Sequence, residues 1–342
     1  MGYDGVKLLV RADASVEIGM GHRVRCQALI HAFTQYGWQC QFVVDRRYQA
    51  FASPEDCFIG GQSEKECTEK ECKTEFLSLA EQADLVILDH YGYSAEDITV
   101  LHQHQPNLLV LDDMNDRGDF PAKWLLNPLQ QGYSKQIEFP LTGSRYALLR
   151  PAFQKLELNQ ILPQQLLITL GGTDPLTLTL PILNALLASG FPTKDIQVLL
   201  GANAKNADKV ISFCHHNSIA FEQGLADVTY LMKQAKMAIS AAGGTLFELA
   251  CMGVPTVFAQ VADNQTRSLE QHVPLDWCRS IRFDNVPEEV RQQRIEQLVE
   301  VINRYWLDIE WQENARKTAR GLVDGDGANR VAKTINSYFA AS

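Results

Sequence analysis

LLITLGGTDPLTLTLPILNAL, residues 166–186, carries the pattern that decides the fold of this chain. An apolar run predicts a buried strand over 166–170, two glycines follow it, and Thr173, Asp174 and Pro175 then predict the capped start of a helix. A strand that runs through a glycine turn into a helix N-terminus offers backbone N–H groups to a diphosphate. The alternative interpretation is a tight strand-to-helix turn with a capped helix and no ligand.

The same alternation of short apolar runs and longer amphipathic segments continues along the chain. Strands are predicted at 7–11, 41–45, 85–89, 108–112, 124–127, 166–170, 196–200, 237–240 and 255–259. Residues 150–163 have proline near both ends and no clear period, which predicts a linker. We therefore expect two α/β domains, 1–152 and 153–342, each with a parallel sheet and with polar residues lining a cleft at the carboxyl ends of its strands.

The last part of the chain has a different pattern. Residues 288–306, EEVRQQRIEQLVEVINRYW, and residues 329–339 have helical periodicity, and GLVDGDGAN, residues 321–329, predicts a turn between them. The charged segment 57–74 is interpreted as a solvated excursion without chemistry.

Composition narrows the classes of function. The chain has 342 residues, of which 46% are hydrophobic and 21% charged, with a formal net charge of −10 and no basic block. Such a chain folds as a globular protein, and a nucleic-acid or anionic-membrane surface is not expected. The eight cysteines have no disulfide-framework or zinc spacing, and no targeting or membrane-spanning segment is recognisable, so we expect reduced thiols, a cytoplasmic location and no metal.

The N-terminal motif RADASVEIGMGHRVRCQALIHAF, residues 11–33, follows the first predicted strand. Val24 replaces the third glycine of the dinucleotide fingerprint, which disfavours a dinucleotide site. His22 follows Gly21 where a helix is expected to begin. Because the positive end of a helix disfavours the imidazolium, a neutral ring that accepts a proton is expected, although an ordinary helix-start histidine is the alternative. Asp13 could orient this ring or cap the loop.

A third motif, MAISAAGGTLFELACMGVPTVFAQVADNQ, covers residues 237–265. Gly243, Gly244 and Thr245 predict another helix start after a strand, and Glu248 lies one turn further on, where its carboxylate could accept hydrogen bonds from the hydroxyls of a ribose. Asn264 and its neighbour Gln265 begin a segment expected at the same cleft. Two glycine-rich helix starts with a nearby glutamate are typical of a sugar-nucleotide site.

These motifs resemble those of the GT-B superfamily, in which two Rossmann-like domains face each other across a cleft and the nucleotide-sugar binds mainly to the C-terminal domain. The Gly-Gly-Thr with Glu at 243–248 resembles the donor site of the lipid II-forming N-acetylglucosaminyltransferase. A closer resemblance is to the UDP-sugar hydrolases of pseudaminic acid biosynthesis. It rests on Arg11-Ala12-Asp13, Gly19-x-Gly21-His22 with Arg25 and Cys26, Asp89-x-Tyr91, Asp112-Asp113, Gly-Gly-Thr-Asp-Pro at 171–175 and SAAGGTLFELACMGVP at 240–255.

The resemblance implies hydrolysis of UDP-2,4-diacetamido-2,4,6-trideoxy-β-L-altrose with inversion at C1, without cofactor or metal, as a step of polysaccharide biosynthesis that serves flagellin glycosylation. His22 matches the catalytic base. The substrate-binding positions are Gly21, Arg25, Tyr91, Gly171, Gly172, Thr173, Gly243, Gly244, Thr245, Glu248, Asn264 and Gln265, with Asp13 as the orienting candidate. The last helix is expected to pack back toward the N-terminal domain. The implied partners are the UDP-sugar and UDP, with no nucleic acid or membrane, for a monomer or weak oligomer.

Physical reasoning agrees with this role and leaves three alternatives. A neutral His22 opposite a UDP site can activate water, while helix ends and backbone donors stabilise the departing UDP without magnesium. Asp112-Asp113 is interpreted as a loop cap rather than a metal pair. The alternatives are a GT-B glycosyltransferase, a hydrolysing 2-epimerase, and a sugar-nucleotide-binding module without turnover.

Overall fold

The computed structural model describes residues 5–15, 19–61, 68–129, 132–133, 136–154 and 163–341. The chain divides into two compact units. Unit 1 comprises Met1–Pro151 and Gly325–Ser342, and unit 2 comprises Ala152–Asp324. The division falls one residue from the predicted boundary, and the last segment of the chain belongs to unit 1. The prediction counted this segment in the second domain, with its last helix packing back toward the N-terminal domain. No helix of the described residues is long and apolar enough to cross a membrane.

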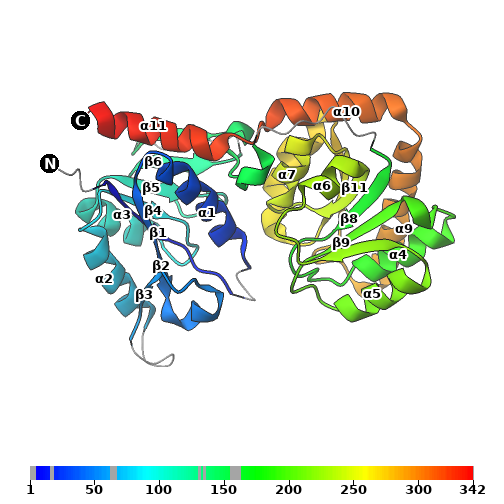
Figure 1. Cartoon of the computed structure of the whole chain (residues 1–342), viewed down its shortest axis with the longest axis horizontal. Helices are drawn as coiled ribbons and strands as arrows, with labels where there is room; N and C mark the ends of the chain where they lie inside the picture. Colours follow the sequence, from blue (N-terminus) through cyan, green and yellow to red (C-terminus); the bar gives the residue numbers. More distant parts are fainter. Residues whose placement is uncertain are drawn as a thin grey trace. The chain divides into compact units, whose positions relative to one another are not determined.

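Unit 1 is a seven-stranded sheet with helices on both faces (Figure 1). Its strands are β1 (Lys7–Arg11), β2 (Gln39–Asp45), β3 (Cys57–Ile59), β4 (Leu85–Leu88), β5 (Leu108–Leu111), β6 (Ala122–Asn127) and β7 (Ile137–Thr142). Its helices are α1 (Gly21–Thr34), α2 (Glu69–Ala80), α3 (Ala95–His104) and α11 (Gly327–Ala341). The strand order is β3-β2-β1-β4-β5-β6-β7, and the described ladders are parallel.

Apolar side chains fill both faces of this sheet. One cluster joins the strands to α1 and α11, with Leu29, Phe33, Val331 and Ile335 fully buried. The other joins the opposite face to α2 and α3. The predicted helix at the end of the chain therefore forms part of the unit 1 core, because its buried residues repeat at helical spacing against α1.

Unit 2 is a six-stranded sheet in the order β10-β9-β8-β11-β12-β13. Its strands are β8 (Gln165–Thr169), β9 (Ile196–Leu200), β10 (Ala220–Gln223), β11 (Ala235–Ala241), β12 (Thr256–Gln260) and β13 (Cys278–Arg282). Its helices are α4 (Thr179–Ala188), α5 (Ala207–His216), α6 (Thr229–Gln234), α7 (Thr245–Met252), α8 (Thr266–His272), α9 (Glu288–Trp306) and α10 (Ile309–Leu322). Its described ladders are parallel as well.

Each sheet has a point where the strand order reverses. In unit 1 the chain builds β1, β2 and β3 outward and then returns to place β4 beside β1. In unit 2 it builds β8, β9 and β10 and returns to place β11 beside β8. Ligands of open α/β sheets bind at the carboxyl ends of the strands that flank such a point. The loops after β1 and β4, and those after β8 and β11, are therefore the candidate sites.

Two predictions about local structure are corrected. The charged segment 57–74 is not only a solvated excursion, because β3 pairs with β2 and α2 begins at Glu69 behind a capping box at Thr68; residues 62–67 of this segment lie outside the described part. The helix after β8 begins at Thr179 rather than beside Pro175. Asp174 still caps it, accepting hydrogen bonds from the backbone N–H groups of Leu178 and Thr179 at 3.0 Å each.

Candidate functional site

His22 lies in the first turn of α1, at the reversal point of unit 1. Its side chain is buried, with 6% of the residue exposed, and Nδ1 lies 2.7 Å from Oδ1 of Asp89. Asp89 directly follows β4, the neighbour of β1 in the sheet. The strand order therefore brings together a histidine after one strand and a carboxylate after the next.

Arg25 holds the same carboxylate with two parallel hydrogen bonds. Its Nε lies 2.6 Å from Oδ2 of Asp89, and its Nη2 lies 2.5 Å from Oδ1. Burial raises the pKa of Asp89, but the positive charge of Arg25 and the hydrogen bonds from Arg25 and His22 outweigh burial, so this pKa lies well below its usual range. Asp89 is therefore ionised at neutral pH.

The charge of Asp89 decides which nitrogen of His22 carries the hydrogen. An ionised carboxylate only accepts, so Nδ1 of His22 donates to Asp89 and Nε2 keeps a lone pair. Nη2 of Arg25 also lies 3.1 Å from Nδ1; with both atoms bearing hydrogen, this is a contact between two donors that share one carboxylate oxygen. Among the residues that the structure describes, none is hydrogen-bonded to Nε2 of His22. This arrangement suits a general base.

Tyr91 and Asp113 complete the site in unit 1. The Tyr91 ring packs edge-on against the imidazole of His22, with ring centroids 4.5 Å apart, and half of Tyr91 is exposed. Its hydroxyl donates to Oδ2 of Asp113 at 3.0 Å, and Nη1 of Arg25 donates to the same oxygen at 2.9 Å. Burial, together with the nearby carboxylate of Asp113, raises the pKa of Tyr91, so the hydroxyl remains protonated.

Asp13, the expected orienting residue, contacts other groups. Its Oδ1 accepts from Nη1 of Arg11 at 2.5 Å and from the backbone N–H of Asp45 at 3.0 Å, while Oδ2 lies 3.0 Å from Nε2 of His90. Asp13 therefore joins the ends of β1 and β2, and Asp89 is the residue that orients His22. The sequence carried one signal for Asp89, a carboxylate directly after a predicted strand, but that strand becomes the neighbour of β1 only in the folded sheet.

His90 differs from His22 because both of its nitrogens are engaged. Nε2 lies against Asp13, and Nδ1 accepts from the backbone N–H of Gly92 at 2.9 Å. Burial is the largest cause that lowers the pKa of His90. His90 is therefore a neutral structural residue of the loop after β4.

In unit 2, the loop after β8 presents bare backbone at the reversal point. Gly171 has a φ of +80°, which favours glycine. Gly172 and Gly171 have no atom within 4 Å of the position a Cβ would take. On its other side this loop packs tightly, because a Cβ on Gly201 would lie 2.2 Å from the carbonyl oxygen of Gly172, and the backbone N–H of Lys205 donates to Thr173 at 2.8 Å. The loop is held firmly and its glycines are accessible.

The loop after β11 is built in a similar way. Gly243 and Gly244 are exposed, neither has a positive φ, and no atom lies within 4 Å of a Cβ built on either. The fold itself therefore does not require glycine here. Helix α7 begins at Thr245 without a side-chain cap, and Glu248 lies in its first turn. These N–H groups are suited to an anion that approaches the backbone closely.

Asn264 and Gln265 follow β12, which pairs with β11. Asn264 is exposed. Gln265 is buried, and its Oε1 accepts from the backbone N–H of Val261 at 3.0 Å, so it stabilises its own loop. Of these two predicted ligand contacts, Asn264 is the one whose side chain is open to solvent.

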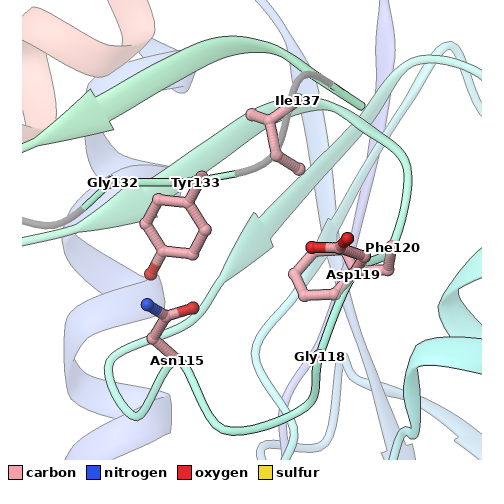
Figure 2. Close-up of a pocket in the computed structure, with 7 residues that line it drawn as sticks. All are labelled: Asn115, Gly118, Asp119, Phe120, Gly132, Tyr133 and Ile137. Atoms are coloured by element: carbon pink, nitrogen blue, oxygen red, sulfur yellow. The ribbon is translucent and has the colours of Figure 1, made fainter.

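A hollow of about 250 Å³ lies on unit 1 beside the loop after β5. Its lining residues are Asn115, Gly118, Asp119, Phe120, Gly132, Tyr133 and Ile137, and Figure 2 shows Asn115 and Tyr133 on one wall with Asp119 and Phe120 opposite. The Tyr133 hydroxyl donates to the carbonyl oxygen of Asp112 at 2.8 Å. Asp112 is buried, and burial raises its pKa. The hollow therefore lies beside the backbone of Asp112, the residue before Asp113.

Among the described residues no group of three His, Cys, Asp or Glu side chains could hold a metal ion.

The sequence of this chain was compared with those of known proteins and protein families. No protein-family model matches the chain. The spore coat polysaccharide biosynthesis protein SpsG of Bacillus subtilis is 26% identical over 351 aligned positions, covering 96% of this chain and 97% of that protein. The UDP-2,4-diacetamido-2,4,6-trideoxy-β-L-altropyranose hydrolase of Campylobacter jejuni is 25% identical over 256 positions, covering 69% of this chain and 85% of that protein.

The solved structures show the fold. MurG of Acinetobacter baumannii superimposes with a TM-score of 0.65 at 14% identity, covering 97% of this chain and 99% of MurG. Two parallel-sheet units are the architecture expected from the alternation of apolar runs and amphipathic segments along the chain. The chain therefore has the GT-B-type fold, with two Rossmann-like α/β units.

Proposed function

We propose that this chain hydrolyses a UDP-linked diacetamido-trideoxy sugar, UDP-2,4-diacetamido-2,4,6-trideoxy-β-L-altrose, to UDP and the free sugar, with inversion at C1 and without a metal. The observation that carries the proposal is the His22–Asp89 pair at the reversal point of unit 1, with Nε2 left to accept a proton. The resemblance to the UDP-sugar hydrolase of Campylobacter jejuni supports the choice of substrate and reaction.

Unit 2 would bind the UDP part. The diphosphate would lie against backbone N–H groups of the loops at 171–173 and 243–245, where the open space beside the glycines allows close approach. Glu248 in the first turn of α7 would accept hydrogen bonds from the ribose hydroxyls, and the exposed Asn264 would contact the sugar or phosphates. The proposal requires that the bound substrate present C1 of the sugar to His22.

The chemical step balances without a cofactor. Nε2 of His22 accepts a proton from water while the water oxygen bonds to C1 on the face opposite UDP. The bond between C1 and the phosphate oxygen breaks, and UDP leaves with the electron pair. Asp89 stabilises the imidazolium that forms, and backbone donors stabilise the growing charge on UDP. His22 then returns its proton to solvent.

A substitution of His22 tests the proposal. His22→Gln keeps the size of the side chain but removes the base, so we expect UDP release to fall by about 100-fold or more, since general bases typically contribute 10²–10⁴. UDP affinity, measured by calorimetry, should stay within about twofold, because a diphosphate site on unit 2 does not use His22. Reactions are run in EDTA, with the anomer of the first product assigned by NMR. His31→Gln, an exposed histidine of the same helix, is the matched control.

Each alternative predicts a different outcome of the same experiment. UDP release that requires an added acceptor would indicate a glycosyltransferase, and a product epimerised at C2 would indicate a hydrolysing 2-epimerase. UDP binding without turnover would indicate a binding module. Equal loss of UDP release and UDP affinity in His22→Gln would contradict the role of His22 as a base.

A further inference from the structure

Arg25 lies at the centre of a continuous chain of polar contacts in unit 1. The guanidinium donates to both carboxylate oxygens of Asp89 and, with Nη1, to Oδ2 of Asp113. Asp89 accepts from His22, and Asp113 accepts from Tyr91. The base and the half-exposed tyrosine beside it are thus connected through one arginine that binds two carboxylates.

We propose that Arg25 is a positioning residue that fixes His22 through Asp89 and Tyr91 through Asp113, rather than a residue that contacts the substrate's phosphates. The proposal rests on the proposed role of His22 as the base. It changes the assignment of Arg25, which the sequence places among the substrate-binding positions.

The charges around Arg25 argue against a phosphate contact. One guanidinium faces two carboxylates. Burial raises the pKa of Asp113, but the attraction of Arg25 outweighs burial, so this pKa, like that of Asp89, lies below its usual value. Both carboxylates are therefore ionised, and the group Asp89, Arg25 and Asp113 carries a net charge of −1. A diphosphate placed here would be repelled, whereas an uncharged sugar would not.

The shape of the arginine side chain explains why lysine would not replace it. A guanidinium can bind one carboxylate through Nε and Nη2 and another through Nη1, all in one plane. An ammonium group is a point charge that cannot span both carboxylates with fixed geometry. Without this arginine, Asp89 and Asp113 would move independently. The imidazole of His22 and the hydroxyl of Tyr91 would then no longer be held in a fixed position relative to each other.

Arg25→Lys tests the proposal, with Arg23→Lys as the matched control. Arg23 belongs to the same helix and is also buried, but it pairs with Asp56 at 2.7 Å and Ser53 at 3.0 Å, away from His22. For Arg25→Lys we expect kcat to fall by about 100-fold, the loss typical of a misplaced catalytic group, with KM and UDP affinity within about twofold. Arg23→Lys should change neither kcat nor KM.

A second set of variants tests the proposal even if the Arg25→Lys protein does not fold correctly. Asp113→Asn and Tyr91→Phe remove the two ends of one contact, so their effects on kcat should be less than additive when combined. Additive effects would contradict the chain of contacts. A rise in the Kd for UDP of tenfold or more in Arg25→Lys, with kcat little changed, would overturn the proposal and return Arg25 to the phosphate site.

A spectroscopic measurement separates failure of this proposal from failure of the proposed function. The ring-nitrogen NMR signals of His22 report its tautomer and protonation without any substrate. If the wild-type protein hydrolyses no UDP-sugar, the function is wrong, yet Arg25→Lys should still weaken the preference for hydrogen on Nδ1 of His22. Unchanged His22 signals in a folded Arg25→Lys variant would overturn the positioning role.

Discussion

At the scale of single residues, the site in unit 1 depends on which atoms face Nδ1 of His22. Asp89 accepts from Nδ1, and the bonds from Arg25 keep it charged. His22 and Asp89 are 67 positions apart in the sequence, so no local pattern pairs them. The catalytic role of a histidine can be proposed from its place at a helix start, whereas its tautomer depends on a partner supplied by another strand.

Asp89→Asn is the variant that tests the tautomer. An amide of the same shape can present a donor to the ring, which favours hydrogen on Nε2 and removes the base. We expect kcat to fall by about 10⁴, the loss seen when the orienting carboxylate of a catalytic histidine is replaced by an amide. The loss is measured as UDP release, and the NMR signals of His22 should report hydrogen on Nε2. Retention of full activity would show that Asp89 does not set the tautomer.

At the scale of elements, the two glycine loops of unit 2 are the features that local sequence predicts best. Periodicity identified β8 and β11, and the glycines after them have the accessible backbone expected of a phosphate cradle. The detail that differs is the loop after β8, where the helix starts at Thr179. Asp174 has a φ of +42° and caps that helix from a distance, a geometry that the order of residues does not reveal.

Gly243→Ala tests whether the glycine serves a ligand or the fold. Because its φ is ordinary and the space around it is open, a methyl group should leave the thermal stability nearly unchanged. The same methyl group would obstruct a diphosphate against the backbone, so we expect UDP affinity to fall by about tenfold or more, equivalent to about 1.4 kcal/mol. Binding is measured by calorimetry.

Gly321→Ala in α10 provides the control, since it too has open space around the added methyl group and is exposed. It should leave UDP affinity unchanged and can raise helix stability slightly. An unchanged Kd for UDP in Gly243→Ala would place the diphosphate elsewhere.

The strands also show where local patterns fail. The nine strands predicted from apolar runs are the interior strands of the two sheets, and the four that the prediction missed, β3, β7, β10 and β13, lie at the sheet edges. Edge strands have one unpaired side and more exposed residues, so they tolerate polar side chains and proline. Pro140 in β7 and the exposed residues of β10 illustrate this. Their pattern therefore does not resemble that of a buried parallel strand.

At the scale of the whole molecule, the end of the chain belongs to the core of unit 1. Helix α11 packs on α1 (Figure 1). A Cβ on Gly327, the first residue of α11, would lie 2.2 Å from the carbonyl oxygen of Ala147. Trp38 donates from Nε1 to Asn336 at 2.9 Å. The last residues are thus needed to complete a unit whose other strands and helices precede residue 152.

Ile335→Ala measures this contribution. Ile335 is fully buried in the cluster between α1, α11 and the sheet, and replacing such a side chain typically costs about 2–5 kcal/mol of unfolding free energy. Hydrogen–deuterium exchange should become faster across unit 1 and change little in unit 2. Ile302→Ala in α9, equally buried, should have the reverse effect. Faster exchange confined to unit 2 in Ile335→Ala would show that α11 does not stabilise unit 1.

Local sequence patterns predicted the class of the fold, the interior strands, the glycine loops and the position of His22 at a helix start. These features depend on periodicity and backbone freedom within a few residues, so they are legible along the chain. The hydrogen bond of His22 to Asp89 rather than Asp13, and the contacts of Arg25 with two carboxylates, became visible only in the folded sheet. Those contacts arise because the strand order places β4 beside β1 and β5 beside β4, so that residues far apart in the sequence meet at one end of the sheet.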